Sequence, residues 1–335
     1  MRVLVIGQGL AGTLVSHFAL ERDWDVHVID AGLPSASAVA AGMFNPMSFR
    51  RIVPVWEAEA HLAVMLQTYQ AIERILGVTL LHHLPIHKVL PNAEYAGLWN
   101  EKRKTNPWLE PSQSEHDKKG IVSGGGWLNL PLLIQEWRQR LTAAGRFDGR
   151  LSDSNDLPKT QGGTWDAIVD CRGIGIHAPS ELVPLDIRKN RGELLTISCP
   201  ENSIGPPADA VLNFGKWTIP VGRGKWRLGA SYEWHRDDFD PTPETRTFLI
   251  SALTSQTPSI GPISVEDHLV GMRPVSKDRR PAVGPYPGAA GRYVLNGLGT
   301  RGVLIGPRWA QNLIHIMAGT AQIIPETEPL RLAMP

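Results

Sequence analysis

The sequence has few cysteines, no long apolar run and almost no net charge. Only Cys171 and Cys199 occur in 335 residues, both in apolar stretches and without a C-x-x-C partner, so we expect buried free thiols and no thiol redox chemistry. Since no run of about 18 apolar residues and no signal-peptide pattern is present, a membrane span is not expected. The net charge of +1 gives no electrostatic footprint for nucleic acid or an anionic membrane. A cytoplasmic protein is predicted.

The sequence contains 42% hydrophobic residues, enough to form the cores of about two domains. The chain opens on an apolar run, Arg2 to Ile6, typical of a strand buried on both faces. A glycine turn, a helical stretch "TLVSHFALERD" and a second strand, Asp25 to Asp30, follow. This β–α–β order predicts a doubly wound α/β fold.

The first glycine turn, "GQGLAG", has the spacing G-x-G-x-x-G at Gly7, Gly9 and Gly12. The first glycine permits a tight turn, the second lets backbone amides approach a pyrophosphate, and the third lets helix and strand pack closely. Asp30 ends the second strand, where a carboxylate accepts hydrogen bonds from a ribose. We predict a dinucleotide site here that also includes Leu10 and Ala11. The motif alone does not separate NAD from FAD.

Further elements alternate along the chain. Helices are predicted in "VWEAEAHLAVMLQTYQAIERILG", ended by Gly77, and in "LNLPLLIQEWRQRLTAAG". "TWDAIVDCRGIG" is expected to be a strand that runs into Gly173, a further expected cofactor residue. "RGELLTISC" with "KWTIPVGRGKWRLGAS" predicts an antiparallel sheet with a hairpin at "VGRGK". We therefore expect a Rossmann-like domain formed by residues 1–50, 122–190 and 268–335. A mixed, largely antiparallel substrate-binding domain, formed by residues 51–121 and 191–267, would be inserted into it.

Two segments favour FAD. "SASAVAAGMFNP" is rich in small residues, which would let backbone lie against a large planar cofactor, although composition alone also fits an ordinary loop. "NGLGTRGVLIGP" is a second glycine loop that leads into a helix, whose N-terminus would stabilise the anionic reduced flavin. The cofactor residues expected in these segments are Ala36, Ser37, Ala41, Gly42, Met43, Gly299, Thr300, Arg301, Gly302, Val303 and Leu304.

The motifs "GQGLAG", "AAGM", "GMRPVSKDRRPAVG" and "GLGTRGVLIGP", in this order, resemble the FAD-dependent glycine oxidase, D-amino acid oxidase and sarcosine oxidase family. The resemblance implies an oxidoreductase that transfers hydride from the carbon of an amine C–N bond to flavin N5. The imine product would hydrolyse, and oxygen or another acceptor would take the electrons. No cysteine or histidine stands in "SASAVAAGM", where some relatives attach flavin, so non-covalent FAD is predicted.

The resemblance gives Arg273, in "GMRP", the role of holding the substrate carboxylate. A planar guanidinium makes a bidentate, charge-assisted grip on a carboxylate, and Pro274 restricts the residues before it. The alternative is a structural arginine paired with Glu266 or Asp267. For the other bases of this run, Lys277, Arg279 and Arg280, a solvated loop is expected.

Three further residues correspond to family positions around the active site. Arg301 corresponds to a second arginine near the flavin, and its alternative is a surface loop charge. Trp217 stands where the family has a tyrosine, and Tyr232 falls at another pocket-lining position; both could equally be core or interface aromatics. The change from tyrosine to tryptophan removes a hydroxyl, so it puts a glycine oxidase substrate in doubt.

Other functions stay open at this stage. The stretch "LHHLPIH" hints at a metal site through His82, His83 and His87, but no acidic or cysteine ligand joins it and Pro85 interrupts a shared face, so a loop or edge strand without metal is preferred. Besides an amino-acid or amine oxidase or dehydrogenase, we consider a flavoenzyme for a modified tRNA base, an NAD-dependent dehydrogenase and a non-catalytic FAD-binding protein. The small net charge argues against the RNA substrate, and the terminal glycine loop argues against NAD.

Overall fold

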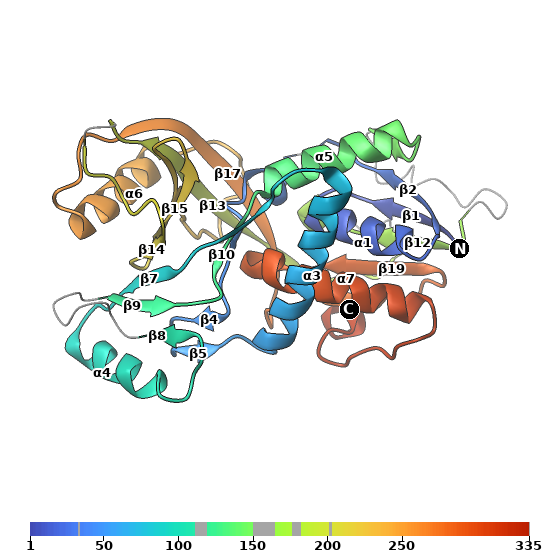
Figure 1. Cartoon of the computed structure of the whole chain (residues 1–335). Coiled ribbons are helices and arrows are strands. Elements are labelled where there is room, and N and C mark those ends of the chain that lie inside the picture. Colours follow the sequence, from blue (N-terminus) through green and yellow to red (C-terminus); the bar gives the residue numbers. More distant parts are fainter. Residues whose placement is uncertain (33, 111–118, 150–164, 176–181, 201–202, 335) are drawn as a thin grey trace.

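The computed structural model of the chain describes residues 1–32, 34–110, 119–149, 165–175, 182–200 and 203–334. Figure 1 shows two lobes side by side, one a sheet covered by helices and the other a larger sheet with helices α4 (Ala93–Lys102) and α6 (Pro243–Gln256) at its outside. In this described part of the chain, no helix is long and apolar enough to cross a membrane.

The first lobe contains a six-stranded sheet in the order β11-β2-β1-β12-β19-β18. Its strands are β1 (Arg2–Ile6), β2 (Asp25–Ile29), β11 (Phe147–Asp148), β12 (Ala167–Asp170), β18 (Ala282–Pro285) and β19 (Arg292–Asn296). All neighbours are parallel except β18 and β19, which pair antiparallel. The predicted doubly wound architecture is therefore confirmed, with β1 and β12 at its centre.

Four helices pack on one face of this sheet, namely α1 (Leu10–Leu20), α3 (Ala58–Leu76), α5 (Leu130–Ala143) and α7 (Gly302–Met317). Helix α3 ends where the sequence predicts, and the predicted helix α5 carries its proline at its start. Gly77 caps α3 in the left-handed conformation with φ +69°, which glycine adopts without steric cost. Pro131 lies in the first turn of α5, where a missing N–H costs nothing. The opposite face of the sheet carries a smaller apolar cluster that includes Leu4, Ile6 and Ile168.

The second lobe contains an eight-stranded sheet in the order β17-β13-β16-β15-β14-β7-β9-β8. Its strands are β7 (Ile86–Val89), β8 (Leu109–Glu110), β9 (Lys119–Val122), β13 (Ile187–Ser198), β14 (Val211–Asn213), β15 (Trp217–Gly222), β16 (Lys225–Gly229) and β17 (Ser264–Ser276). Only β7 and β14 pair parallel. The predicted mixed, largely antiparallel sheet and the β15–β16 hairpin are both present.

The longest pairing joins β13 and β17, from Ile187 opposite Ser276 to Ser198 opposite Ser264. In Figure 1 this pair extends from the second lobe to the first. The domain limits expected at 190/191 and 267/268 fall inside these two strands, so the sheet continues across them. The limits themselves stay a prediction.

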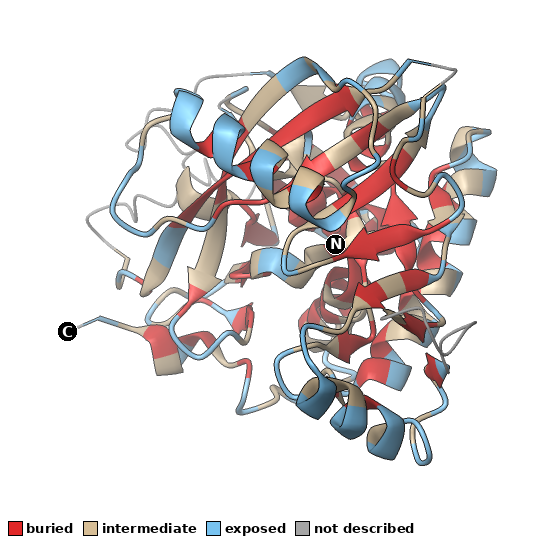
Figure 2. Cartoon of the chain, turned by 90° about the vertical axis from the view of Figure 1, so that its left-hand side faces the viewer, coloured by how far each residue is buried: buried red, intermediate tan, exposed pale blue. Residues whose placement is uncertain are grey.

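Short elements complete the described chain. They are α2 (Ala36–Val39), β3 (Met43–Phe44), β4 (Met47–Ser48), β5 (Val53–Pro54), β6 (Leu81–His83), β10 (Gly126–Leu128), η1 (Gly173–Gly175), η2 (Gly299–Arg301) and η3 (Pro329–Leu332). Figure 2 shows buried residues concentrated in the strands, whereas the peripheral helices turn exposed residues outwards. Both cysteines are free. Cys171 is buried as expected, whereas Cys199 is only partly buried, and burial raises the pKa of each thiol.

The histidine stretch lies in β6 and β7. His82 stacks on Trp127 with 4.2 Å between ring centroids, and His83 packs edge-on to Phe44. Burial lowers the pKa of His82. Among the residues that the structure describes, no group of three or more His, Cys, Asp or Glu side chains could hold a metal ion.

Candidate active site

A cavity of about 640 Å³ lies where the carboxyl ends of β1, β2, β12 and β19 face the strand pair β13–β17. Ligands of doubly wound folds bind at this end of the sheet. The cavity brings together most of the residues singled out from the sequence: Gly7, Gly9, Leu10, Ala11, Asp30, Ala36, Ser37, Ala41, Gly42, Met43, Gly173, Trp217, Tyr232, Arg273, Gly299, Thr300, Gly302 and Val303. Gly12, Arg301 and Leu304 are not among its described lining residues.

The glycine loop has the backbone that its spacing predicts. Gly7 adopts φ +93°, a conformation that disfavours a side chain. A Cβ on Gly12 would lie 1.9 Å from the carbonyl oxygen of Gly7, so only glycine lets α1 begin this close to β1. Gly12 thus acts through packing, and the cavity wall is formed by Gly7, Gly9 and the first residues of α1.

Asp30 follows the end of β2 and is fixed from three sides. Its carboxylate accepts hydrogen bonds from the backbone N–H groups of Gln8 at 2.6 Å and Gly32 at 2.8 Å. The Arg138 guanidinium, from α5, approaches it at 3.5 Å and also donates to Gln8 Oε1 at 2.6 Å. A carboxylate held in this way can accept hydrogen bonds from ribose hydroxyls without moving. Arg138 and Gln8 were not found from the sequence, because no motif marks them.

The segment "SASAVAAGM" lies between the glycine loop and the long strand pair. The Ser35 hydroxyl caps α2 by accepting from Ser37 N–H, and Ser37 Oγ accepts from the N–H of Leu10 at 3.0 Å. A Cβ on Gly271, in β17, would lie 2.5 Å from Val39 Cγ2, so this glycine lets α2 lie against β17. Small residues here therefore allow close backbone packing around the cavity.

The terminal glycine loop closes another side of the cavity. Gly297 and Gly299 have φ values of +73° and +57°, and α7 begins at Gly302 with its N-terminus at the cavity. Asn296, at the end of β19, donates to the carbonyl of Gly173 at 2.8 Å and ties this loop to the one after β12. Leu304 is only 1% exposed and belongs to the core beneath the loop.

Arg273 lies near the end of β17 and lines the cavity, and no carboxylate among the described residues pairs with it. Its Nη1 donates to Asn190 Oδ1 at 2.9 Å and to the carbonyl of Ser231 at 3.3 Å, and Tyr232 lies 4.6 Å from Cζ. Burial lowers the pKa of this guanidinium. The alternative pairing with Glu266 or Asp267 is not present in the described chain: Glu266 binds Lys225 and Ser198 instead, and no ion pair joins Asp267 to Arg273.

The Arg273 guanidinium packs against strand β13. A Cβ on Gly192 would lie 2.1 Å from Arg273 Nη2 and 2.4 Å from Cζ, so the guanidinium lies directly on the backbone of β13. No residue in the described part of the chain accepts from Nη2. The site therefore presents an oriented, partly desolvated cation, the arrangement that binds a planar anion bidentately.

The other basic residues of "GMRPVSKDRRP" divide into two groups. Lys277 and Arg279 are exposed, in line with the solvated loop expected for them. Arg280 differs, because its Cζ stacks 3.6 Å above the centroid of Trp56. For Arg280 the expectation of a solvated side chain is wrong, since the aromatic face covers it.

The two aromatic candidates, Trp217 and Tyr232, line the cavity, whereas Arg301 does not. Arg301 Nη1 donates to the carbonyl of Asn45 at 3.3 Å, and burial lowers the pKa of the guanidinium. Trp217 begins β15, partly buried, and its ring occupies the space above Gly229, where a Cβ would be 2.7 Å away. Tyr232 lines the cavity yet is 53% exposed, so it marks the mouth.

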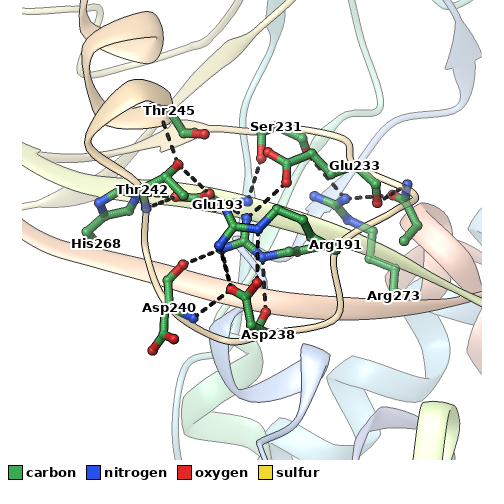
Figure 3. A network of polar contacts seen from close by, with 12 residues as sticks. Arg191, Glu193, Ser231, Glu233, Asp238, Asp240, Thr242, Thr245, His268 and Arg273 are labelled. Atoms are coloured by element: carbon green, nitrogen blue, oxygen red, sulfur yellow. Dashed lines mark hydrogen bonds and ion pairs between the residues drawn. The ribbon is translucent and has the colours of Figure 1, made fainter.

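A buried ion network on the far side of β13 holds the loop 232–242, which contributes Tyr232 and Phe239 to the cavity (Figure 3). Arg191 and Glu193 are both 0% exposed and pair with each other. Arg191 also donates to the backbone carbonyls of Asp238 and Asp240. No local pattern marks this network in the sequence, because β13 and loop 232–242 are about 40 residues apart along the chain.

Glu193 is the centre of this network. Its carboxylate accepts from the Thr242 N–H at 2.9 Å and the Thr242 hydroxyl at 2.8 Å, and His268 Nε2 lies 2.6 Å away. Burial alone raises the pKa of Glu193, but the hydrogen bonds from Thr242 and Arg191 outweigh it and lower the pKa. Loop 232–242 is thus anchored through one carboxylate.

These features bring both glycine loops and the Arg273 guanidinium into one cavity, and comparison with known proteins gives the class of protein. The family described as FAD dependent oxidoreductase (DAO) matches residues 2–315. The chain belongs to this family and is an FAD-dependent oxidoreductase, which confirms the predicted cofactor and the resemblance.

Relatives with known names fall into two groups. The chain is 25% identical to the glycine oxidase of Pseudomonas aeruginosa, over 96% of both chains, and 27% identical to the D-amino-acid oxidase of Streptomyces coelicolor, over 92% and 93%. It is also 27% identical, over 95% of its length, to the tRNA 5-methylaminomethyl-2-thiouridine biosynthesis bifunctional protein MnmC of Polaromonas naphthalenivorans. The chain spans only 57% of that bifunctional protein.

Solved structures share the fold. Iminodiacetate oxidase from Chelativorans sp. BNC1 superposes with a TM-score of 0.80 at 19% identity, covering 98% of this chain and 99% of that one. Glycine oxidase from Geobacillus kaustophilus gives 0.75 at 17% identity, covering 98% of each chain. The predicted fold class, a Rossmann-like FAD-binding domain with a largely antiparallel second sheet, is thereby confirmed.

Proposed function

We propose that the protein oxidises the C–N bond of an amino acid or small amine that carries a carboxylate, and that Arg273 binds this carboxylate. The observation that carries the proposal is the Arg273 guanidinium, which enters the same cavity as the glycine loops and has no acidic partner among the described residues. A buried cation without a counter-charge is costly unless a ligand supplies one. The glycine oxidase and D-amino-acid oxidase relatives support this reading.

The cavity residues fit FAD. Gly7, Gly9 and the start of α1 leave backbone exposed where a pyrophosphate would bind, and Asp30 would hold the ribose. The start of α7 at Gly302 would face the flavin ring with its positive end. When bound, FAD supplies the acceptor for the hydride that leaves the carbon next to the substrate nitrogen, and the imine product hydrolyses in water.

The chain's own contribution is orientation. Arg273, held by Asn190 and Ser231, would fix the carboxylate and with it the direction of the Cα–H bond. Trp217 and Tyr232 would bound the space for the rest of the substrate. Arg301, which does not line the cavity, would add positive charge near the flavin and would act through Asn45 and the start of α7.

A second candidate is oxidation of a modified tRNA base. The similarity to the bifunctional tRNA-modifying proteins favours it, because the matched part includes nearly all of this chain. The net charge of +1 weighs against it, since RNA binding depends on neutralising phosphates.

Anaerobic reduction of the bound flavin tests both candidates. Purified protein should be yellow, and acid or heat should release free FAD, since the predicted attachment is non-covalent. We expect one or more of glycine, N-methyl glycines, proline and D-amino acids to bleach the flavin without oxygen. Bleaching by tRNA alone would replace the first proposal with the second, and colourless protein that binds NAD would reject both.

Gly192 gives a sharper prediction about the orientation of Arg273. In Gly192→Ala the new Cβ displaces the guanidinium, because the backbone of β13 does not yield easily. We expect about a tenfold loss of affinity for benzoate or glycolate, the cost of one charged hydrogen bond, with FAD retained. Flavin difference spectra measure this affinity.

The matched control is Gly97→Ala in α4, where a Cβ would meet nothing within 4 Å. The double variant Gly192→Ala/Arg273→Ala should bind carboxylates no more weakly than Arg273→Ala alone, since both changes remove the same interaction. Additive losses would show that Gly192 acts independently of Arg273.

A further inference from the structure

A second cation, Lys216, stands at the mouth of the cavity. It immediately precedes β15, and its ammonium donates to the carbonyl of Ala230 at 3.0 Å. The Nζ atom lies 5.8 Å from the centroid of Tyr232 and 5.0 Å from that of Phe248. Ala230 and Tyr232 line the cavity and Tyr232 is half exposed, so Lys216, which is not itself among the described lining residues, is held beside the opening.

Neither Lys216 nor Arg273 has an acidic partner among the described residues. Both cations approach the ring of Tyr232, and burial together with the nearby Arg273 charge lowers the pKa of Lys216. Arg172 shows the alternative, since this partly buried guanidinium binds Asp170 at 2.6 Å. Positive charge therefore accumulates around Tyr232 without compensation from the described chain.

The acids nearest in the sequence to Tyr232 are already engaged elsewhere. In loop 232–242, Glu233 pairs with Arg191, Asp237 pairs with Lys189, and Asp238 pairs with Arg236 and Arg191. The loop is thus folded so that these carboxylates turn to other cations and leave Lys216 and Arg273 to a ligand. Two cations at one site favour a ligand with two negative groups.

We propose that the substrate is an amine with two acidic groups, one bound by Arg273 inside the cavity and the other by Lys216 at its mouth. This rests on the proposed function, because it assumes that Arg273 holds the first carboxylate. Both cations approach the ring of Tyr232, which would support the part of the substrate that joins the acidic groups. Small dicarboxylic amines such as iminodiacetate have this chemistry.

The test compares inert monocarboxylates with dicarboxylates on the FAD-loaded protein. Glycolate and acetate are titrated against malonate and succinate, with the flavin spectrum as readout. We expect the better dicarboxylate to bind about tenfold more tightly than the monocarboxylates, the effect of one added charge-assisted hydrogen bond. In Lys216→Met this preference should fall about tenfold, whereas Lys216→Arg should retain most of it.

Lys225→Met is the matched control, since Lys225 lies in the same sheet but pairs with Glu266. A preference for dicarboxylates that survives in Lys216→Met overturns the proposal, as does equal binding of both ligand classes by the unaltered protein. The function proposed above fails separately, if Arg273→Ala binds all these acids as the unaltered protein does. Anaerobic bleaching by iminodiacetate faster than by glycine or sarcosine would support the substrate class, and the reverse order would count against it.

Discussion

Replacing Arg273 with alanine is expected to weaken carboxylate ligands at least about 100-fold while FAD stays bound. The guanidinium would supply two charge-assisted hydrogen bonds, each of which contributes about 1.5 to 3 kcal/mol. It contacts Asn190, Ser231 and Tyr232, all on the substrate side of the cavity, so its removal leaves the glycine loops intact. Titration of the flavin spectrum with benzoate measures the affinity, and kcat/KM for a true substrate should fall by a similar factor.

Two companion variants separate charge from geometry. Arg273→Lys keeps the charge but loses the planar fork, so its affinity should lie between those of the alanine variant and the unaltered protein. Lys277→Ala removes an exposed charge from the same segment and should change affinity little. If Arg273→Ala bound carboxylates as tightly as the unaltered protein, Arg273 would have a structural role and would not bind the substrate.

The second large effect is expected in Glu193→Ala, which should lower the free energy of unfolding by about 3 kcal/mol. Removal of one partner from a buried ion pair leaves the other charge poorly compensated, at a cost of about 3 to 5 kcal/mol. Arg191 is 0% exposed and would keep its hydrogen bonds to the backbone carbonyls of Asp238 and Asp240 and the longer ion contacts with Glu233 and Asp238, which supports the lower end of this range. Denaturant unfolding followed by tryptophan fluorescence gives the measurement.

The same variant should alter the substrate site, because Glu193 fixes Thr242 at the end of loop 232–242. A loosened loop moves Tyr232 and Phe239, so KM should rise more than kcat falls. Glu233→Ala, on a partly exposed member of the network, is the control and should cost less than about 1 kcal/mol. Equal destabilisation by both changes would contradict the central role of Glu193.

Much of the cofactor side could be predicted from sequence because its chemistry is local. The spacing of Gly7, Gly9 and Gly12 encodes a turn whose steric demands are met within a few residues, and Asp30 follows at a fixed distance along one β–α–β unit. The terminal loop around Gly299 has the same local character. Hydrophobic periodicity likewise located α3 and α5.

The substrate side depends on contacts between distant strands, which no local pattern encodes. Asn190 and Gly192 shape the Arg273 site only because β13 pairs with β17, about 80 residues later. The stacking of Arg280 on Trp56 also joins residues that are distant in the sequence. A run of charged residues by itself predicts only a solvated loop. Strands as long as β13 and β17, which extend across both lobes, likewise have no compositional break that would mark a domain limit.

The strand order of the six-stranded sheet also determines when this protein can acquire its shape during synthesis. β1 pairs with β12, and β12 pairs with β19, whose residues 292–296 are made near the end of the described chain. Contacts so distant in sequence form late and slowly, because loop-closure entropy must be overcome first. Until β19 emerges from the ribosome, β12 is an open edge that invites aggregation, so a fragment ending before residue 292 should precipitate, whereas the whole described chain closes this edge.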